Sequence, residues 1–128
     1  MGNRAVIKLE ECPKVGIYLH WNGGRDSVEA FLQTAKDYGI RCDDYGVARL
    51  AQIIGNAIGG TLSVGVNAIE NLDCANWDNG LYIVKDWEIV GREHFEDREE
   101  QNEHSLEDAV AWVKEKNQSC FEETEVTE

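Results

Sequence analysis

Residues 18–27 constrain the fold of this 128-residue chain more than any other stretch. An alternating apolar run over residues 15–21 ends there in an Asn-Gly-Gly turn at 22–24, and a helical pattern begins at Asp26. Alternation with a period of two is typical of a half-buried strand, and paired glycines are typical of tight turns. The stretch therefore predicts a strand that passes directly into a helix.

Four other runs have the alternation or the β-branched composition of strands. They lie at residues 3–9, 61–66, 81–85 and 88–92. The first is expected to pair antiparallel with the strand at 15–21. The last two flank Asp86-Trp87, so they are predicted to form a hairpin.

Two helices are predicted between the second and third strands. The first begins with Asp26 as N-cap, carries Glu29 at the capping-box spacing and ends at Gly39. The second has apolar residues at three- and four-residue spacing over 47–58, which is the clearest helical pattern in the chain.

A last helix is predicted over residues 106–116, with Ser105 as its cap. Residues 117–128 lack periodicity and are expected to be a mobile acidic tail, so the folded domain is expected to be 1–116. The element order ββααβββα groups strands and helices instead of alternating them. It predicts a single α+β domain with a mainly antiparallel sheet and helices on one face.

The charge is concentrated at the C-terminal end. The net charge is −13, and residues 93–128 hold thirteen acidic groups against three basic ones. Such a chain repels nucleic acid and anionic membranes and attracts basic protein surfaces. We therefore expect an acidic interface that imitates nucleic acid. Its members are Glu93, Glu96, Asp97, Glu99, Glu100 and Glu103.

Several classes of protein are disfavoured. No apolar run approaches the roughly 20 residues that cross a bilayer, and the N-terminus has no signal-peptide pattern. The four cysteines form no C-x-x-C pair, which favours free thiols in a reducing cytoplasm over a zinc or redox site. His94 and His104 lack the spacing of metal ligands. No metal and no cofactor are expected.

The turn at 22–24 is a candidate binding site. Backbone N–H groups at a helix N-terminus hold anions, Arg25 can add a guanidinium fork, and Trp21 can offer a stacking face. Asp26 would compete with an anion, and a purely structural tight turn remains the alternative. The candidate ligand- or partner-binding residues are Tyr18, His20, Trp21, Asn22, Gly23, Gly24, Arg25 and Trp77.

Three segments carry a resemblance to known proteins. They are GNRAVI at residues 2–7, GIYLHWNGGRDS at 16–27 and DWEIVGR at 86–92. Together they resemble small uncharacterised proteins of Gram-positive bacteria, their phages and mobile elements. The resemblance implies an accessory protein of a phage or plasmid and no particular reaction. In size and charge such proteins resemble anti-CRISPR and anti-restriction inhibitors.

These observations favour a non-enzymatic inhibitor that acts on a host defence or nucleic-acid-binding protein through acidic surface mimicry. A protein that sequesters a small anionic ligand, such as a nucleotide signal, at the turn is the first alternative. An enzyme is the second alternative. No catalytic residue is assigned, because no Ser or Cys nucleophile accompanies His20 in the sequence.

Overall fold

Five strands form one open sheet with the order β3-β2-β1-β4-β5. They are β1 (Ala5–Leu9), β2 (Val15–Leu19), β3 (Val64–Ala68), β4 (Leu81–Lys85) and β5 (Glu88–Glu93). Neighbouring strands are antiparallel except for the parallel pair of β1 and β4. The predicted α+β class and mainly antiparallel sheet are therefore confirmed.

The computed structural model describes residues 3–58, 64–95, 100 and 104–126, and for 119–126 it describes the backbone alone. The predicted third strand, residues 61–66, begins outside this range. Its described part, 64–66, lies within β3, which continues to Ala68. A short 3₁₀ helix, η1 (Ile69–Asn71), follows β3 and was not predicted.

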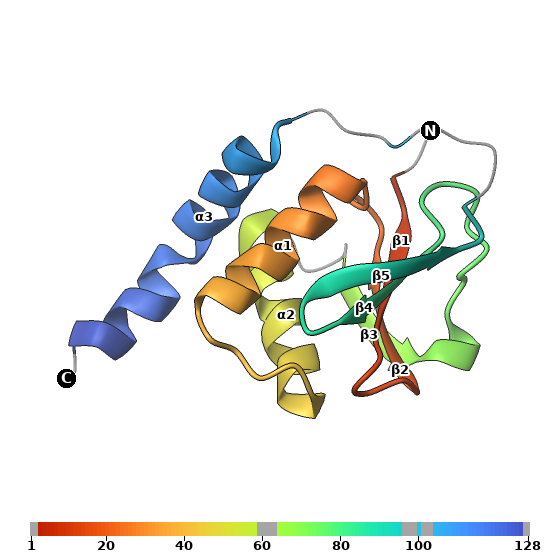
Figure 1. The fold of residues 1–128 in the computed structure, drawn as a ribbon, viewed down its shortest axis with the longest axis horizontal. Coiled ribbons are helices and arrows are strands. Elements are labelled where there is room, and N and C mark those ends of the chain that lie inside the picture. The colour runs from red at the N-terminus through yellow and green to blue at the C-terminus, as the bar shows by residue number, and fades with distance from the viewer. Residues whose placement is uncertain (1–2, 59–63, 96–99, 101–103, 127–128) are drawn as a thin grey trace.

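The helices form two layers on one side of the sheet (Figure 1). Helices α1 (Arg25–Asp37) and α2 (Asp44–Ile58) contact strands, whereas α3 (Leu106–Val126) packs mainly on α1 and α2. The expected one-sided arrangement is therefore present, but α3 forms an outer layer. As a result α1 lies between the sheet and α3.

Strand alternation determines what lies on each face of the sheet. Ile7 and Ile17 face each other across β1 and β2 toward the helices, and each is 1% exposed. On the opposite face, a Cβ at Gly16 would lie 2.5 Å from Ile69 and 2.8 Å from Leu72. The connection between β3 and β4 thus covers part of the face that the helices leave open.

The predicted N-cap of α1 is wrong. Gly24 occupies the cap position, and no side chain caps the helix there. Asp26 lies in the first turn, where its carboxylate accepts hydrogen bonds from the N–H groups of Ser27 (2.8 Å) and His104 (3.1 Å). The carboxylate therefore connects the start of α1 to the segment just before α3.

Two other helix boundaries match the prediction. Gly39 has a φ of 71°, and the Ile40 N–H donates to the Ala35 carbonyl at 3.1 Å, which is the bonding of a Schellman C-cap. At α3, the Ser105 hydroxyl accepts from the Asp108 N–H at 3.1 Å. The predicted caps Gly39 and Ser105 are therefore confirmed.

Helix α3 continues beyond residue 116, its predicted end. The Asn117 side chain is fully buried and donates to the carbonyls of Ile53 (3.1 Å) and Val113 (2.9 Å). Its oxygen accepts from the Asn56 amide at 2.9 Å. These bonds fasten α3 to α2 at a residue that the sequence assigned to the tail, while the mobility of the remaining tail stays a prediction.

The β4–β5 hairpin turns through Asp86 and Trp87, as predicted. Both residues have positive φ values, 51° and 65°, as in the type I′ turn that suits the twist of a hairpin. A bulky residue in this region costs about 1–3 kcal/mol. Burial offsets that cost, because Trp87 is 6% exposed and its indole N–H donates to the Ile40 carbonyl at 2.8 Å.

Three of the four cysteines, Cys12, Cys42 and Cys74, are free thiols, and the Cys120 side chain lies outside the described part. Burial raises the pKa of Cys42 to about 11, so its thiol is protonated at neutral pH. Within the described residues, no helix is long and apolar enough to cross a membrane.

We predict that Asn117→Ala lowers the free energy of unfolding by about 1–3 kcal/mol, because it removes the hydrogen bonds that join the buried Asn117 side chain to Ile53 and Asn56 of α2. Urea unfolding measures this change. Lys116→Ala, at the exposed neighbouring position, is the control and should shift stability by no more than about 0.5 kcal/mol. An unchanged midpoint for Asn117→Ala would show that α3 docking does not depend on this network.

Candidate functional site

The turn between β2 and α1 is held by the protein's own backbone. The Gly23 N–H donates to the Asn3 carbonyl at 2.9 Å, and the Gly23 carbonyl accepts from the Tyr82 hydroxyl at 2.7 Å. A Cβ at Gly23 would lie 2.6 Å from the Asn3 oxygen and 2.7 Å from the Ala5 Cβ. The glycine therefore permits close packing against β1, and its N–H is not available to a ligand.

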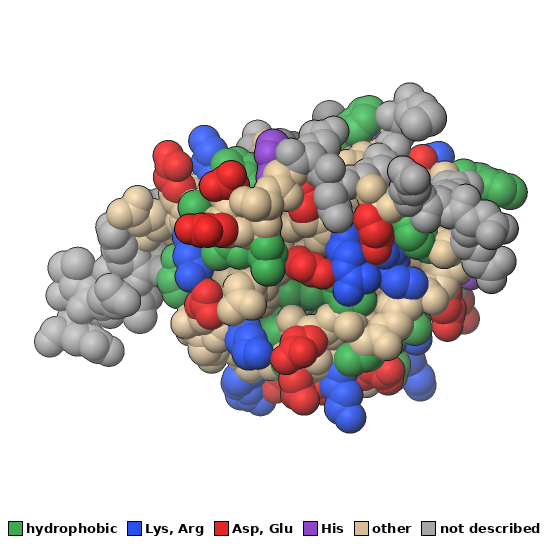
Figure 2. Space-filling model, turned by 45° about the horizontal axis from the view of Figure 1, so that its top comes forward, with side chains coloured by type: hydrophobic (Ala, Val, Ile, Leu, Met, Phe, Trp, Pro, Cys, Tyr) green, Lys and Arg blue, Asp and Glu red, His purple; other side chains and the backbone are tan. Residues whose placement is uncertain are grey.

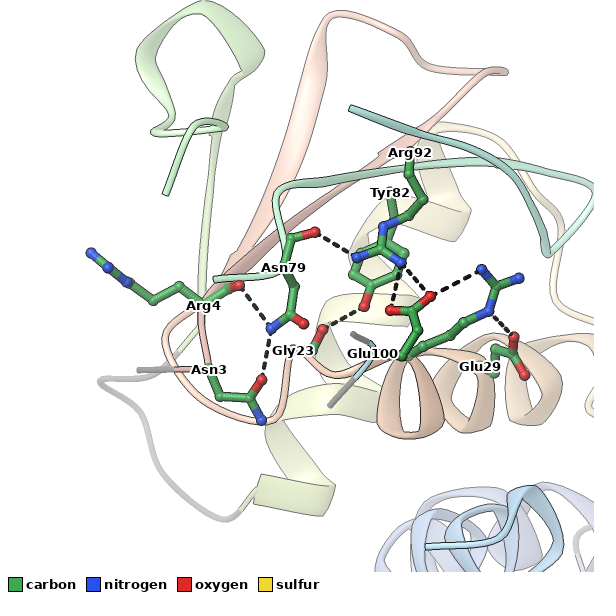
Figure 3. Close-up of polar contacts among 9 residues, drawn as sticks. Asn3, Arg4, Gly23, Glu29, Asn79, Tyr82, Arg92 and Glu100 are labelled. Carbon is green, nitrogen blue, oxygen red and sulfur yellow. Dashed lines mark hydrogen bonds and ion pairs between the residues drawn. The ribbon is translucent and has the colours of Figure 1, made fainter. Parts of the chain in front are cut away.

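The predicted guanidinium fork of Arg25 is already engaged by Glu29 and Glu100, two residues that are labelled in Figure 3. Arg25 donates to Glu29 in the next turn of α1 and forms a longer contact of 3.4 Å with Glu100. The hydrogen bond with Glu29 is the main reason that the pKa of Arg25 is raised. This pairing weakens the case for an anion site at the turn.

Glu100 belongs to a partly buried ion-pair network with Arg25 and Arg92. Its carboxylate accepts two hydrogen bonds of 2.8 Å from Arg92, which also donates to the Asn79 carbonyl at 2.8 Å. The Arg92 side chain is only 12% exposed. Its guanidinium lies 4.0 Å from the ring centre of Tyr82 and 3.8 Å from that of Phe95. Glu100, one member of the predicted acidic interface, therefore has a structural role.

A cleft of about 350 Å³ lies between the first turns of α1 and α3. It is lined by Asn3, Asn22, Asp26, Ser27, His104, Asp108, Ala109 and Trp112. Of the predicted turn residues, Asn22 contributes to this wall. Because the walls carry two carboxylates, the cleft suits a neutral or cationic group better than an anion.

Tyr18, His20 and Trp21 form a contiguous group at the end of β2. The Tyr18 hydroxyl and His20 Nδ1 share a hydrogen bond of 2.9 Å, and the His20 and Trp21 rings meet edge to face at 4.9 Å. Trp21 is 46% exposed, and burial raises the pKa of Tyr18. These three predicted site residues are therefore brought together, with part of the indole open to solvent.

The loop at 76–80 is built on buried polar groups. Asn76 is fully buried, and its side-chain oxygen accepts from the N–H groups of Asp78 (3.1 Å) and Gly80 (3.0 Å). Asp78 in turn accepts from the Arg4 N–H at 3.1 Å and from its guanidinium at 2.7 Å. In contrast, Trp77 is 78% exposed. The sequence did not reveal that Asn76 and Arg4 hold this loop.

The predicted acidic interface is described only in part. Glu93 is exposed at the end of β5, Glu100 is paired with arginines, and Glu96, Asp97, Glu99 and Glu103 lie outside the described residues. Sequence reasoning missed the exposed acids on α3, which are Glu107, Asp108 and Glu115. Their seven- and eight-residue spacing could have indicated one charged helix face.

Acidic and basic side chains are interspersed on the face of the molecule shown in Figure 2. Several red carboxylates there lie beside blue lysine or arginine groups. On the described part of this face, the acidic groups therefore do not form one continuous patch.

The described side chains contain no cluster of three or more His, Cys, Asp and Glu residues that could hold a metal ion. Comparisons of the chain with protein-family models, with curated proteins and with solved structures find no match.

The tight packing at Gly23 predicts that substitution by alanine has opposite effects on stability at Gly23 and at Gly55. Gly23→Ala should lower the free energy of unfolding by about 1–3 kcal/mol, because its methyl group meets the β1 backbone. Gly55→Ala should raise it by up to about 1 kcal/mol, because that site in α2 is open and alanine favours helix. Chemical denaturation measures both. If Gly23→Ala left the free energy of unfolding unchanged, the close approach of Gly23 to Asn3 and Ala5 would have no structural role.

Proposed function

We propose that this protein is a small, acidic, non-enzymatic inhibitor that occupies a nucleic-acid-binding surface of a host defence protein. The proposed target is a basic groove of the kind found in restriction or CRISPR nucleases. The excess of acids in residues 93–128 supports this proposal. It is consistent with the expected origin in a phage or mobile element.

The observation that best supports the proposal is the solvent side of α3. Ala109, Val113 and Asn117 are buried, whereas Asp108 and Glu115 are exposed. These two acids are seven positions apart, so they lie on the same side of the helix, at a separation of about 10 Å along its axis. A regular element of this kind can present a row of negative charge to a groove that accepts a phosphate backbone.

The contacts of Glu100, which precedes α3, also support the proposal. Its bonds to Arg92 and its contact with Arg25 attach Glu100 to β5 and α1. Glu100 is therefore held beside the domain, shortly before α3 begins at Leu106. Acids that precede α3 and acids on α3 can then act on a single partner.

A small-ligand-binding function is supported by the cleft between α1 and α3, because its volume of about 350 Å³ falls within the range of ligand sites. Its carboxylates, and the engaged state of Arg25, do not favour the anionic ligand that the sequence suggested. We place this function second. Native mass spectrometry of protein isolated from its host would reveal a bound small molecule.

The proposal is tested with a panel of purified restriction and CRISPR nucleases, by measuring DNA cleavage while the protein is titrated. We expect inhibition of at least one nuclease, mutual competition with DNA, and a loss of affinity as salt rises, because screening shortens the Debye length from about 10 Å at 0.1 M to about 3 Å at 1 M. Inhibition that does not depend on salt, or no inhibition across the panel, would contradict charge mimicry.

Charge reversal locates the interface. The variant with Glu96, Asp97 and Glu99 changed to Lys should associate at least tenfold more slowly, because steering depends on nearby charge. Glu100 is left unchanged, since its reversal would break the Arg92 network. The matched control reverses Glu122, Glu123 and Glu125, which changes the net charge equally. Equal losses in the two variants would indicate a general charge effect and no defined interface.

A further inference from the structure

The loop at 76–80 holds a single exposed side chain on a rigid frame. Asn76, Asp78, Asn79 and Gly80 are buried, and only Trp77 is exposed. The Asn79 N–H donates to the Arg4 carbonyl at 3.0 Å, in addition to the bonds that Asp78 makes with Arg4. The Trp77 backbone is therefore held on its C-terminal side by the bonds of Asp78 and Asn79 to Arg4. On its N-terminal side, the Asn76 side chain bonds within the loop to Asp78 and Gly80.

Trp77 also has a backbone conformation that tryptophan rarely adopts. Its φ is 65°, in the left-handed region that favours glycine. Trp87 has the same φ, but that indole is 6% exposed and packs in the core. The indole of Trp77 is 78% exposed, so burial does not offset its unfavourable conformation. Strained backbone conformations of this kind are typical of functional sites.

Two exposed acids, Asp73 and Glu93, lie near the base of this loop. The Asp73 carbonyl accepts from the Asn76 amide at 3.1 Å, which places Asp73 beside the loop. Glu93 is exposed and pairs with Leu81, the first residue after the loop. Both acids raise the pKa of the Cys74 thiol, although burial has the larger effect and Lys8 lowers it. Two exposed acids therefore lie near the base of the loop that carries the exposed indole.

We propose that Trp77 is the aromatic anchor of the inhibitor's interface and stacks on an arginine of the basic partner surface. This inference rests on the proposed function. A planar guanidinium can stack on an indole while it pairs with nearby carboxylates such as Glu93. A nucleobase could also stack on the indole, but its phosphates would be repelled by Asp73 and Glu93. The acidic surroundings thus select a basic protein.

The test uses nona-arginine as the probe, with nona-lysine and a single-stranded nine-nucleotide DNA as comparisons. The indole N–H resonance of Trp77, assigned by comparison with Trp77→Phe, should shift with nona-arginine and not with the DNA. Trp77→Gly should weaken nona-arginine binding by about fivefold or more and change nona-lysine binding less. Its melting temperature should be equal to or higher than that of the wild type, because glycine favours a φ of 65°.

Trp21→Ala is the matched control, because Trp21 is the second most exposed of the described tryptophans, at 46%. It should leave nona-arginine affinity within about twofold, and Trp77→Phe should retain much of the binding. Wild-type affinity in Trp77→Gly, or a larger loss in Trp21→Ala, would overturn the assignment of Trp77. DNA binding that depends on Trp77 would also overturn it and would identify a nucleic-acid-stacking site.

The two proposals fail in different ways. If nuclease inhibition is lost on reversal of Glu96, Asp97 and Glu99 but persists in Trp77→Gly, charge mimicry stands and the anchor is wrong. If the probe requires Trp77 but no nuclease is inhibited, Trp77 binds arginine and the proposed target class is wrong.

Discussion

The backbone of Asn3 and Arg4 joins two turns that are far apart in the sequence. The Asn3 carbonyl accepts the Gly23 N–H, and the Arg4 carbonyl accepts the Asn79 N–H. Arg4 also holds Asp78 through its main chain and its guanidinium. The candidate binding residues around Gly23 lie at the first turn, and Trp77 lies at the second. The positions of both therefore depend on this short segment before β1. Buried polar groups with specific partners can fix such a geometry more uniquely than apolar packing.

Periodicity was sufficient to predict most elements but not how they assemble. Alternation identified the strands, and Asp86-Trp87 correctly indicated the hairpin. The parallel pairing of β1 with β4 could not be predicted, because the alternation of a strand contains no information about its neighbour. The outer layer was missed for a related reason. Ala30 and Thr34 are buried on α1, yet small or polar residues do not stand out as an apolar helix face.

The sequence predicted which residues belong to the candidate site better than it predicted what each of them does. The glycine at position 23 indicated a close approach, but sequence alone could not distinguish a ligand from the β1 backbone. Glu100 resembles its acidic neighbours in sequence, and only its spatial position beside Arg92 separates a structural acid from a solvated one. Trp77 was predicted only as a candidate binding residue, with no assignment of its burial. Its exposure follows from long-range bonds to Arg4, which local sequence patterns do not reveal.

The central position of β1 has a consequence for how the chain acquires its fold. During synthesis, β1 and β2 emerge first and can pair as a hairpin, whereas the other edge of β1 must wait for β4. Until then, a strand with buried residues such as Val6 and Ile7 presents unpaired backbone groups, which promote association between chains. Closing so long a loop is slow compared with forming a local hairpin. Early exposure of this edge therefore makes the nascent chain most vulnerable to aggregation before residue 81 has left the ribosome.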